Sequence, residues 1–317
     1  MKKFLLPIIA FLTLAACNKD VEFADYKYQT VYFAYQYPVR TLTFGEDIFN
    51  TDLDNQGKCQ IMVTTGGVYS NKRNLNIGIA VDNSLLGNGL LFGAGKDEIL
   101  PMPANYYTLA ANSIVIPEGG LTGGVEVQLT QAFFNDPKAI KNTYVIPVRI
   151  ADKSGADSVL VGKHFTLYAI KYVNPWHGNY LRRGKDVITG SVNQTIVRHQ
   201  QYVEKDEVNK LNTRAMKQLE FPVVFKDKNG VNVNCPLLLT FDDAGKCTIA
   251  AANASFTATG NGQFVKRGEK NSWGSKDRDA LYLNYQVTLP DMQVASTDTL
   301  VMRDRAVTME TYVPVNK

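Results

Sequence analysis

The chain has 317 residues, which favours two domains because single hydrophobic cores rarely grow beyond about 250–300 residues. With 45% apolar and 20% charged residues, the composition excludes an intrinsically disordered chain. The net charge is only +4 and no basic stripe is present, which argues against nucleic acid as a partner.

The N-terminus has the layout of a secretory signal. Lys2 and Lys3 precede an apolar run over residues 4–14. As a helix this run would cover roughly 16 Å, about half of a ~30 Å hydrocarbon core, so we interpret it as a signal segment and not as a membrane span. The motif Leu14-Ala15-Ala16-Cys17 resembles the bacterial lipobox, in which the cysteine is acylated after cleavage. We therefore expect lipidation of Cys17; the alternative is an ordinary signal peptide with an incidental cysteine.

A short charged leader follows the expected lipidation site. It contains Asn18, Lys19, Asp20 and Glu22. Acidic and lysine-containing leaders of this kind resemble the export signal of Bacteroidetes lipoproteins. The resemblance implies an outer-membrane protein held by its lipid anchor and exposed at the cell surface.

Short runs of β-branched and aromatic residues dominate the first half of the chain, and Gly, Asn, Asp or Pro separates them. Such runs predict strands, and their spacing is typical of a β-sandwich. At most a turn or two of helix is expected around residues 135–139. The predicted strands cover residues 30–37, 58–65, 74–81, 112–117, 124–130, 143–150 and 164–173.

The same pattern resumes after Asn174-Pro175, where proline interrupts strand pairing and marks a domain junction. The segment 203–217 fits a helical face only in part, and we predict loop and strand there. Cys59, Cys235 and Cys247 are odd in number and widely spaced, so we interpret them as small buried hydrophobic residues. Strands are predicted over residues 178–184, 187–200, 217–227, 233–241, 246–252, 262–268, 279–289 and 299–313.

Several blocks of the sequence resemble a known family. The segments 31–34, 101–109, 114–119 and 144–150 resemble an N-terminal immunoglobulin-like domain of unknown function. This domain is common in Bacteroidetes surface lipoproteins of glycan-utilisation clusters. The second half resembles the β-rich partner domain of such proteins, a lipocalin-like barrel or a jelly roll. The resemblance implies surface glycan binding or adhesion; some relatives add an endoglycosidase domain, and no such third domain is expected here.

The expected fold is therefore all-β, with an immunoglobulin-like β-sandwich followed by an antiparallel β-barrel or β-sandwich. The expected parts are a signal peptide (1–16), a tether (17–29), the immunoglobulin-like domain (30–173) and the barrel or jelly-roll domain (174–317).

No catalytic set stands out in the sequence. The chain has three histidines and lacks a Gly-x-Ser-x-Gly motif in a strand-to-helix context. Asp52 and Asp54 half-match a calcium loop, but Val63 occupies the position of the bidentate carboxylate, so a plain turn is expected. A glycosidase needs two nearby carboxylates, which cannot be paired from sequence alone. We expect neither a metal nor a cofactor, and no enzymatic activity.

Sugar binding requires aromatic faces for the C–H side of a sugar ring and polar groups for its hydroxyls. The segments 176–183 and 271–285 offer this mixture. Alternatively, Trp176 packs between the two domains and Tyr282 belongs to a core. The candidate glycan-binding residues are Trp176, Tyr180, Trp273, Arg278 and Tyr282.

These observations predict a lipid-anchored, non-catalytic surface protein that binds polysaccharide or glycoprotein glycans and presents them for uptake. The expected partners are a glycan, the outer membrane and other surface proteins of glycan uptake. Two alternatives stay open, an adhesive or structural lipoprotein that binds a protein partner, and a glycoside hydrolase or its accessory.

Overall fold

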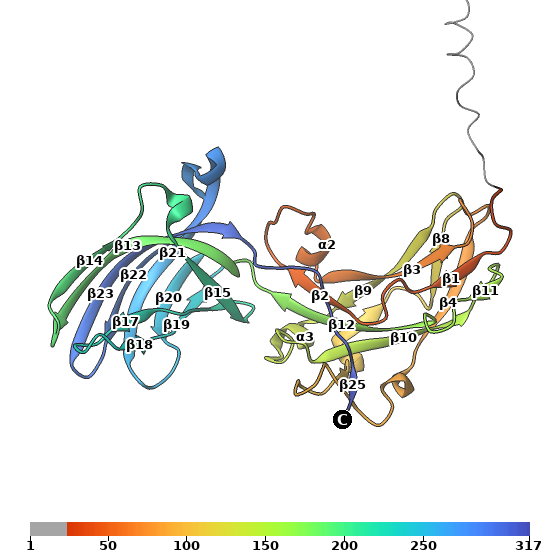
Figure 1. Cartoon of the computed structure of the whole chain (residues 1–317), viewed down its shortest axis with the longest axis horizontal. Helices are drawn as coiled ribbons and strands as arrows, with labels where there is room; N and C mark the ends of the chain where they lie inside the picture. Colours follow the sequence, from red (N-terminus) through yellow and green to blue (C-terminus); the bar gives the residue numbers. More distant parts are fainter. Residues whose placement is uncertain (1–23) are drawn as a thin grey trace, which may run out of the picture.

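The structure is a computed structural model that describes residues 24–317. Residues 1–23, which include Cys17 and the expected signal peptide, lie outside this range. The described chain forms two β-rich domains that lie end to end (Figure 1). No helix in the described range is long and apolar enough to cross a membrane.

Two sheets packed face to face form the first domain. The first has the strand order β11-β1-β3-β9-β7. Its strands are β1 (Thr30–Tyr32), β3 (Lys58–Gly66), β7 (Tyr107–Leu109), β9 (Thr122–Leu129) and β11 (Ser158–Val159). The second has the order β24-β2-β12-β10-β4-β8, and β6 pairs with β10. Its strands are β2 (Pro38–Thr43), β4 (Leu75–Val81), β6 (Leu100–Pro101), β8 (Ser113–Ile116), β10 (Tyr144–Asp152), β12 (Phe165–Val173) and β24 (Glu310–Thr311).

Alternation of side chains along the strands builds the core of this sandwich. In β3, for example, Cys59, Ile61 and Val63 point inward and the residues between them are more exposed. Short helices lie at the connections: α2 (Asp52–Asn55), η1 (Asn83–Leu86), η2 (Ala104–Tyr106) and α3 (Gln131–Asn135). Helix α3 thus ends where the short helix was expected to begin.

A closed eight-stranded antiparallel barrel forms the second domain. Strand β13 closes it by pairing with β23, and β14 extends the sheet beyond β13. Its strands are β13 (Gly178–Gly190), β14 (Gln194–Arg198), β15 (Glu207–Ala215), β16 (Gln218–Phe221), β19 (Leu237–Phe241), β20 (Lys246–Ala251), β21 (Thr257–Ser272), β22 (Lys276–Thr288) and β23 (Met292–Asp304). A separate hairpin pairs β17 (Val224–Lys226) with β18 (Asn232–Asn234), and single turns are η3 (Val203–Lys205) and η4 (Trp273–Ser275).

The all-β prediction is therefore confirmed, and the barrel is the correct alternative for the second domain. The ambiguous segment 203–217 contains β15, in line with the predicted strand, and one helical turn, η3, in place of the predicted loop. The three cysteines Cys59, Cys235 and Cys247 are free and buried, and burial raises the pKa of Cys59 and of Cys247 to about 12.

The C-terminal tail leaves the barrel and returns to the sandwich (Figure 1). Strand β24 pairs with β2, and β25 (Val315–Asn316) pairs with β5 (Leu90–Leu91). The Tyr312 ring lies 4.8 Å from that of Phe92, and its hydroxyl donates to the Leu167 carbonyl at 2.8 Å. The end of the range 174–317, which the sequence assigns to the second domain, thus pairs with strands of the first, and such pairing between distant segments leaves no local signal.

Buried polar groups hold the two domains together where the chain crosses between them. Arg305 donates to the carbonyls of His177, Glu46 and Asn174 at 2.8, 2.9 and 2.7 Å. The Asn174 side chain donates in turn to the Ala215 and Gln218 carbonyls of the barrel. Asn174 is fully buried and Arg305 nearly so. The guanidinium therefore joins backbone from both domains.

We expect Arg305→Met to lower the free energy of unfolding by about 3 kcal/mol, because two buried carbonyls and one partly buried carbonyl lose a charged donor. Urea unfolding of both variants measures this. The neighbouring Arg303→Met is the control: Arg303 is about half exposed, and a change within about 0.5 kcal/mol is expected. Equal effects of the two substitutions would contradict the role given to Arg305.

The junction should also make stability depend on pH. Burial, together with the cations Lys210 and Arg305, lowers the pKa of His177 to about 3, and its Nδ1 accepts from the Thr213 amide at 3.1 Å. The pKa is about 6.5 in the unfolded chain, so this stabilisation is complete above about pH 6.5 and is lost as the pH falls toward 3.

We expect His177→Asn, which keeps an acceptor near Nδ1 but does not titrate, to show a shallower loss of stability than the wild type between pH 6.5 and 4. Thermal unfolding across that range measures the slopes. Parallel pH profiles for the two proteins would show that His177 is not the source of the pH dependence.

Candidate functional site

A cavity of about 660 Å³ lies at the barrel wall between β14 and the β17–β18 hairpin. It arises because β13 changes partner along its length. Residues 178–182 of β13 pair with β15, whereas residues 184–188 pair with β14. Side chains of β13, β14 and β17 line the cavity and include Arg182, Asp186, Ile188, Ile196, Arg198 and Phe225.

Charged residues take inward positions on the strands beside this cavity. On β13, Arg182, Asp186 and Ile188 are buried, whereas the intervening Lys185 and Val187 are exposed. Because alternate residues of a strand share a face, the two charges point into the barrel. On β23, Ser296 and Asp298 take inward positions in the same way.

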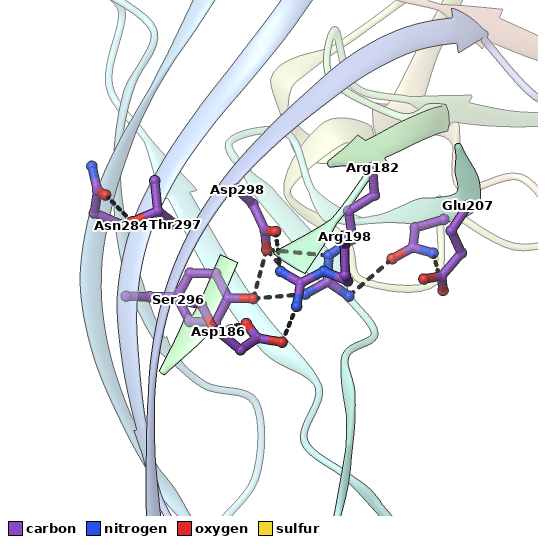
Figure 2. Close-up of polar contacts among 10 residues, drawn as sticks. Arg182, Asp186, Arg198, Glu207, Asn284, Ser296, Thr297 and Asp298 are labelled. Atoms are coloured by element: carbon purple, nitrogen blue, oxygen red, sulfur yellow. Dashed lines mark hydrogen bonds and ion pairs between the residues drawn. The ribbon is translucent and has the colours of Figure 1, made fainter. Parts of the chain in front are cut away.

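Figure 2 shows these side chains joined in one network. Arg198 is paired with Asp186 and, at 2.6 Å, with Asp298. Arg182 also reaches Asp298, at 3.0 Å. The Tyr285 hydroxyl donates to the same carboxylate at 2.7 Å, and Ser296 Oγ donates to Asp186 at 2.6 Å. Two arginines and two aspartates therefore balance their charges inside the barrel.

The network continues to the rim through β15. Arg182 Nη1 donates to Asn209 Oδ1 at 3.4 Å, and Asn209 Nδ2 donates to Glu207 at 2.7 Å (Figure 2). Burial lowers the pKa of Arg182, but Tyr285 and Asp298 outweigh this effect, and the pKa is raised overall. Burial and the Asp298 carboxylate raise the pKa of Tyr285. Arg182 therefore stays a cation and Tyr285 stays a neutral donor.

Gly184 allows the Arg198–Asp298 contact. Gly184 pairs with Arg198 on one side and with Asp298 on the other. The Arg198–Asp298 ion pair therefore crosses β13 at Gly184. A Cβ at Gly184 would lie 2.5 Å from Asp298 Oδ1. Any side chain at this position would therefore displace the carboxylate.

The arrangement is suited to hydrogen bonding. Asp186 and Asp298 both accept hydrogen bonds from arginines. No group of three or more potential metal ligands occurs within residues 24–317.

Among the predicted glycan-binding residues, Trp273 and Arg278 contact each other through their side chains. The Arg278 guanidinium stacks 3.5 Å from the centre of the Trp273 ring, and Arg278 lines a hollow of about 230 Å³ between the domains. Tyr282 is half-buried, and its hydroxyl donates to Glu269 at 2.8 Å. Burial and that carboxylate raise the pKa of Tyr282 to about 12.

The other two aromatic candidates pack in the barrel. Tyr180 is 0% exposed and its hydroxyl donates to the Trp176 carbonyl, so its side chain offers no surface in this structure. Trp176 stacks on Phe241 with 3.9 Å between ring centres, which leaves one face of its indole covered. Trp176 and Tyr180 pack inward because both directly follow the junction, where the chain enters the barrel core. Cys17 lies outside the described residues.

Sequence reasoning missed the residues of the network. Arg182 and Asp186 share the inward phase of Tyr180 and Ile188, and Asp298 shares that of Val294 and Leu300. Charges at apolar positions of an alternating strand were the signal that could have revealed them.

Comparison with known proteins agrees with this two-domain division. A family model described as a domain of unknown function, DUF5627, matches residues 175–306, and a second, described as an N-terminal domain, matches residues 26–157. The chain is similar to a Bacteroides ovatus protein of unknown function with a crystal structure, at 43% identity and a TM-score of 0.86, covering 92% of this chain and 99% of that one. No curated protein matches the chain.

Two further crystal structures are more distant. A second Bacteroides ovatus protein of unknown function is 13% identical, with a TM-score of 0.43 and coverage of 90% of this chain and 100% of that one. An auxiliary nutrient binding protein from Bacteroides thetaiotaomicron is 14% identical, with a TM-score of 0.41 and coverage of 86% and 95%. Likeness at this level transfers neither a site nor a ligand.

We expect Asp298→Asn to lower the free energy of unfolding by about 3 kcal/mol, because it leaves Arg182 buried without a carboxylate. Urea unfolding measures the change. Asp291 is exposed in the turn between β22 and β23, and Asp291→Asn should change the free energy of unfolding by about 0.5 kcal/mol or less. A small effect at Asp298 would show that the network does not stabilise the barrel.

Proposed function

We propose that this chain, which belongs to the family of the Bacteroides ovatus protein of unknown function that matches both of its domains, is a non-catalytic carbohydrate-binding protein. The barrel cavity beside the arginine–aspartate network is the proposed binding site. The observation that carries the proposal is the charge-balanced network at the wall of a cavity large enough for a sugar.

The cavity has the properties of a small-ligand site. Its volume of about 660 Å³ falls within the range of ligand pockets, about 300–1,000 Å³, and barrel mouths are common places for them. Ile188, Ile196 and Phe225 offer apolar surface for the C–H face of a sugar ring. Arg182 and Asp186 lie beside them as donor and acceptor, and each sugar hydroxyl both donates and accepts.

The balance of charge favours an uncharged ligand. Arg182 and Arg198 are already paired with Asp186 and Asp298. An anion or a cation would have to break one of these buried pairs, which is unfavourable. A neutral sugar can exchange hydrogen bonds with the network and leave its ion pairs in place.

We further propose that the protein is anchored through acylated Cys17 and faces outward from the outer membrane. Each buried CH₂ of an acyl chain contributes about 0.8 kcal/mol, so two or more chains hold a protein stably. The described chain begins at the end of the sandwich remote from the barrel (Figure 1). The sandwich then acts as a spacer that holds the cavity away from the membrane, where other surface uptake proteins receive the glycan.

A single substitution should block the cavity and leave every residue of the network in the sequence. We expect Ile196→Trp to weaken binding of a glycan identified on an array by at least about tenfold, because the indole would occupy the space of a ligand. Isothermal titration measures the affinity. Val197→Trp is the matched control: Val197 is the next residue, is 60% exposed on the opposite face of β14 and should bind as the wild type does.

Three outcomes would overturn the proposal. The wild type could bind no glycan on arrays of host and plant polysaccharides. Both tryptophan variants could bind equally well, which would place the ligand elsewhere. Release of oligosaccharides from a bound glycan would instead make the protein a hydrolase.

A further inference from the structure

A second hollow, of about 530 Å³, lies on the opposite side of β13 from the cavity. Its side chains come from β13, β23 and the end of β14. Arg183 and Lys185 take the outward positions of β13, and their cross-strand partners on β23 are Thr299 and Thr297. His199 follows β14 directly. The hollow is thus lined by cations, an imidazole and hydroxyls, and no acidic residue lines it.

Two buried guanidinium nitrogens at this hollow have no acceptor among the described residues. They are Arg183 Nη2 and Arg198 Nε. Both arginines line the hollow. A buried charged donor without an acceptor is unfavourable, and few are tolerated in a folded protein. Each of these two lining arginines therefore keeps one donor that no oxygen of the described residues satisfies.

The rest of each arginine is held in position by carboxylates. Arg183 Nε donates to Asp206 at 2.6 Å, and the Asp206 side chain is buried and also accepts from the Gln200 amide at 2.6 Å. Arg198 is fixed by Asp186 and Asp298 on the cavity side. The free nitrogens are thus preorganised. Lys185, which no carboxylate pairs in the described chain, leaves this surface with an excess positive charge.

We propose that this hollow binds an oxyanion, a carboxylate or a sulfate group carried by a ligand. Such a group supplies several acceptor oxygens, which guanidinium groups bind with strong charge-assisted hydrogen bonds. It would accept from the Thr299 hydroxyl, balance Lys185 and lie beside the two arginines that keep an unpaired donor. The site lies on the other side of β13 from the sugar cavity, shares only Arg198 with its lining, and does not depend on the cavity holding a ligand.

The test is a titration of the protein with sodium sulfate and, separately, with sodium glucuronate. Sodium chloride keeps the ionic strength constant and corrects for general salt effects. The side-chain NMR resonances of His199 and of the arginine Nε–H groups report on the hollow directly. We expect saturable shifts with at least one of the two anions; a response to sulfate alone or to glucuronate alone identifies which oxyanion the site prefers.

Matched variants locate the effect. Lys185→Gln and His199→Gln change exposed side chains without a buried partner, so both should fold, and each should weaken binding by about threefold. Arg183→Gln should weaken it by about tenfold or more, although it also disturbs Asp206. Lys246→Gln, an exposed lysine on β20, is the control and should have no effect.

Absence of saturable binding by either anion would overturn the proposal. The proposal would also fail if the affinity for the anion stayed unchanged in all three variants, Lys185→Gln, His199→Gln and Lys246→Gln. Ile196→Trp, which blocks the cavity, should leave anion binding intact, so failure of the sugar site and failure of the anion site give different results.

Discussion

The ion pair between Arg198 and Asp298 spans the strand that closes the barrel. It passes over Gly184, and through Asp186, Arg182 and Tyr285 it connects side chains of β13, β14, β22 and β23. A pair of charges in this place is favourable only when each carboxylate and guanidinium finds further partners, because removing them from water is costly. The neighbouring hydroxyls and amide provide those partners, and the barrel wall depends on the whole set.

The same network explains why a cavity persists beside it. Apolar side chains could fill the barrel at this level, as they do around Leu211, Leu219 and Leu281 elsewhere in the barrel core. Charged side chains cannot be replaced by such packing without losing their partners. Polar groups therefore face an open space next to Ile188 and Phe225, which is the mixture that a polar organic ligand with apolar faces requires.

The junction fixes the direction in which this cavity points. The chain crosses between the domains twice, at residues 173–178 and again at 304–310, and Arg305 ties both crossings together. The C-terminal strands then pair with the sandwich. Two covalent crossings and a buried guanidinium restrict hinge motion far more than a single linker would. Outside the crossings, the ion pairs of Glu46 with Lys266 and Arg267 are exposed and add little to this.

The sequence was sufficient for the parts of the fold that depend on local patterns. Alternation located the strands, and Pro175 located the junction. It could not show that residues 310–316 return to the first domain, since that depends on pairing with β2 and β5 far away in the chain. For the site, composition favoured aromatic residues, and of these Tyr180 is buried in the barrel. The inward charges Arg182, Asp186 and Asp298 are joined in one network only because β13 pairs with β23, and a local sequence pattern does not show that pairing.

Hydrogen–deuterium exchange of the wild-type protein with and without a glycan selected on an array tests the proposed cavity site most directly. A ligand in the barrel cavity predicts slower amide exchange in β13, β14 and β17, with the sandwich unchanged. Protection confined to the β21–β22 hairpin, where Trp273 and Arg278 stack, would contradict a cavity site and place the glycan on the outside of the barrel.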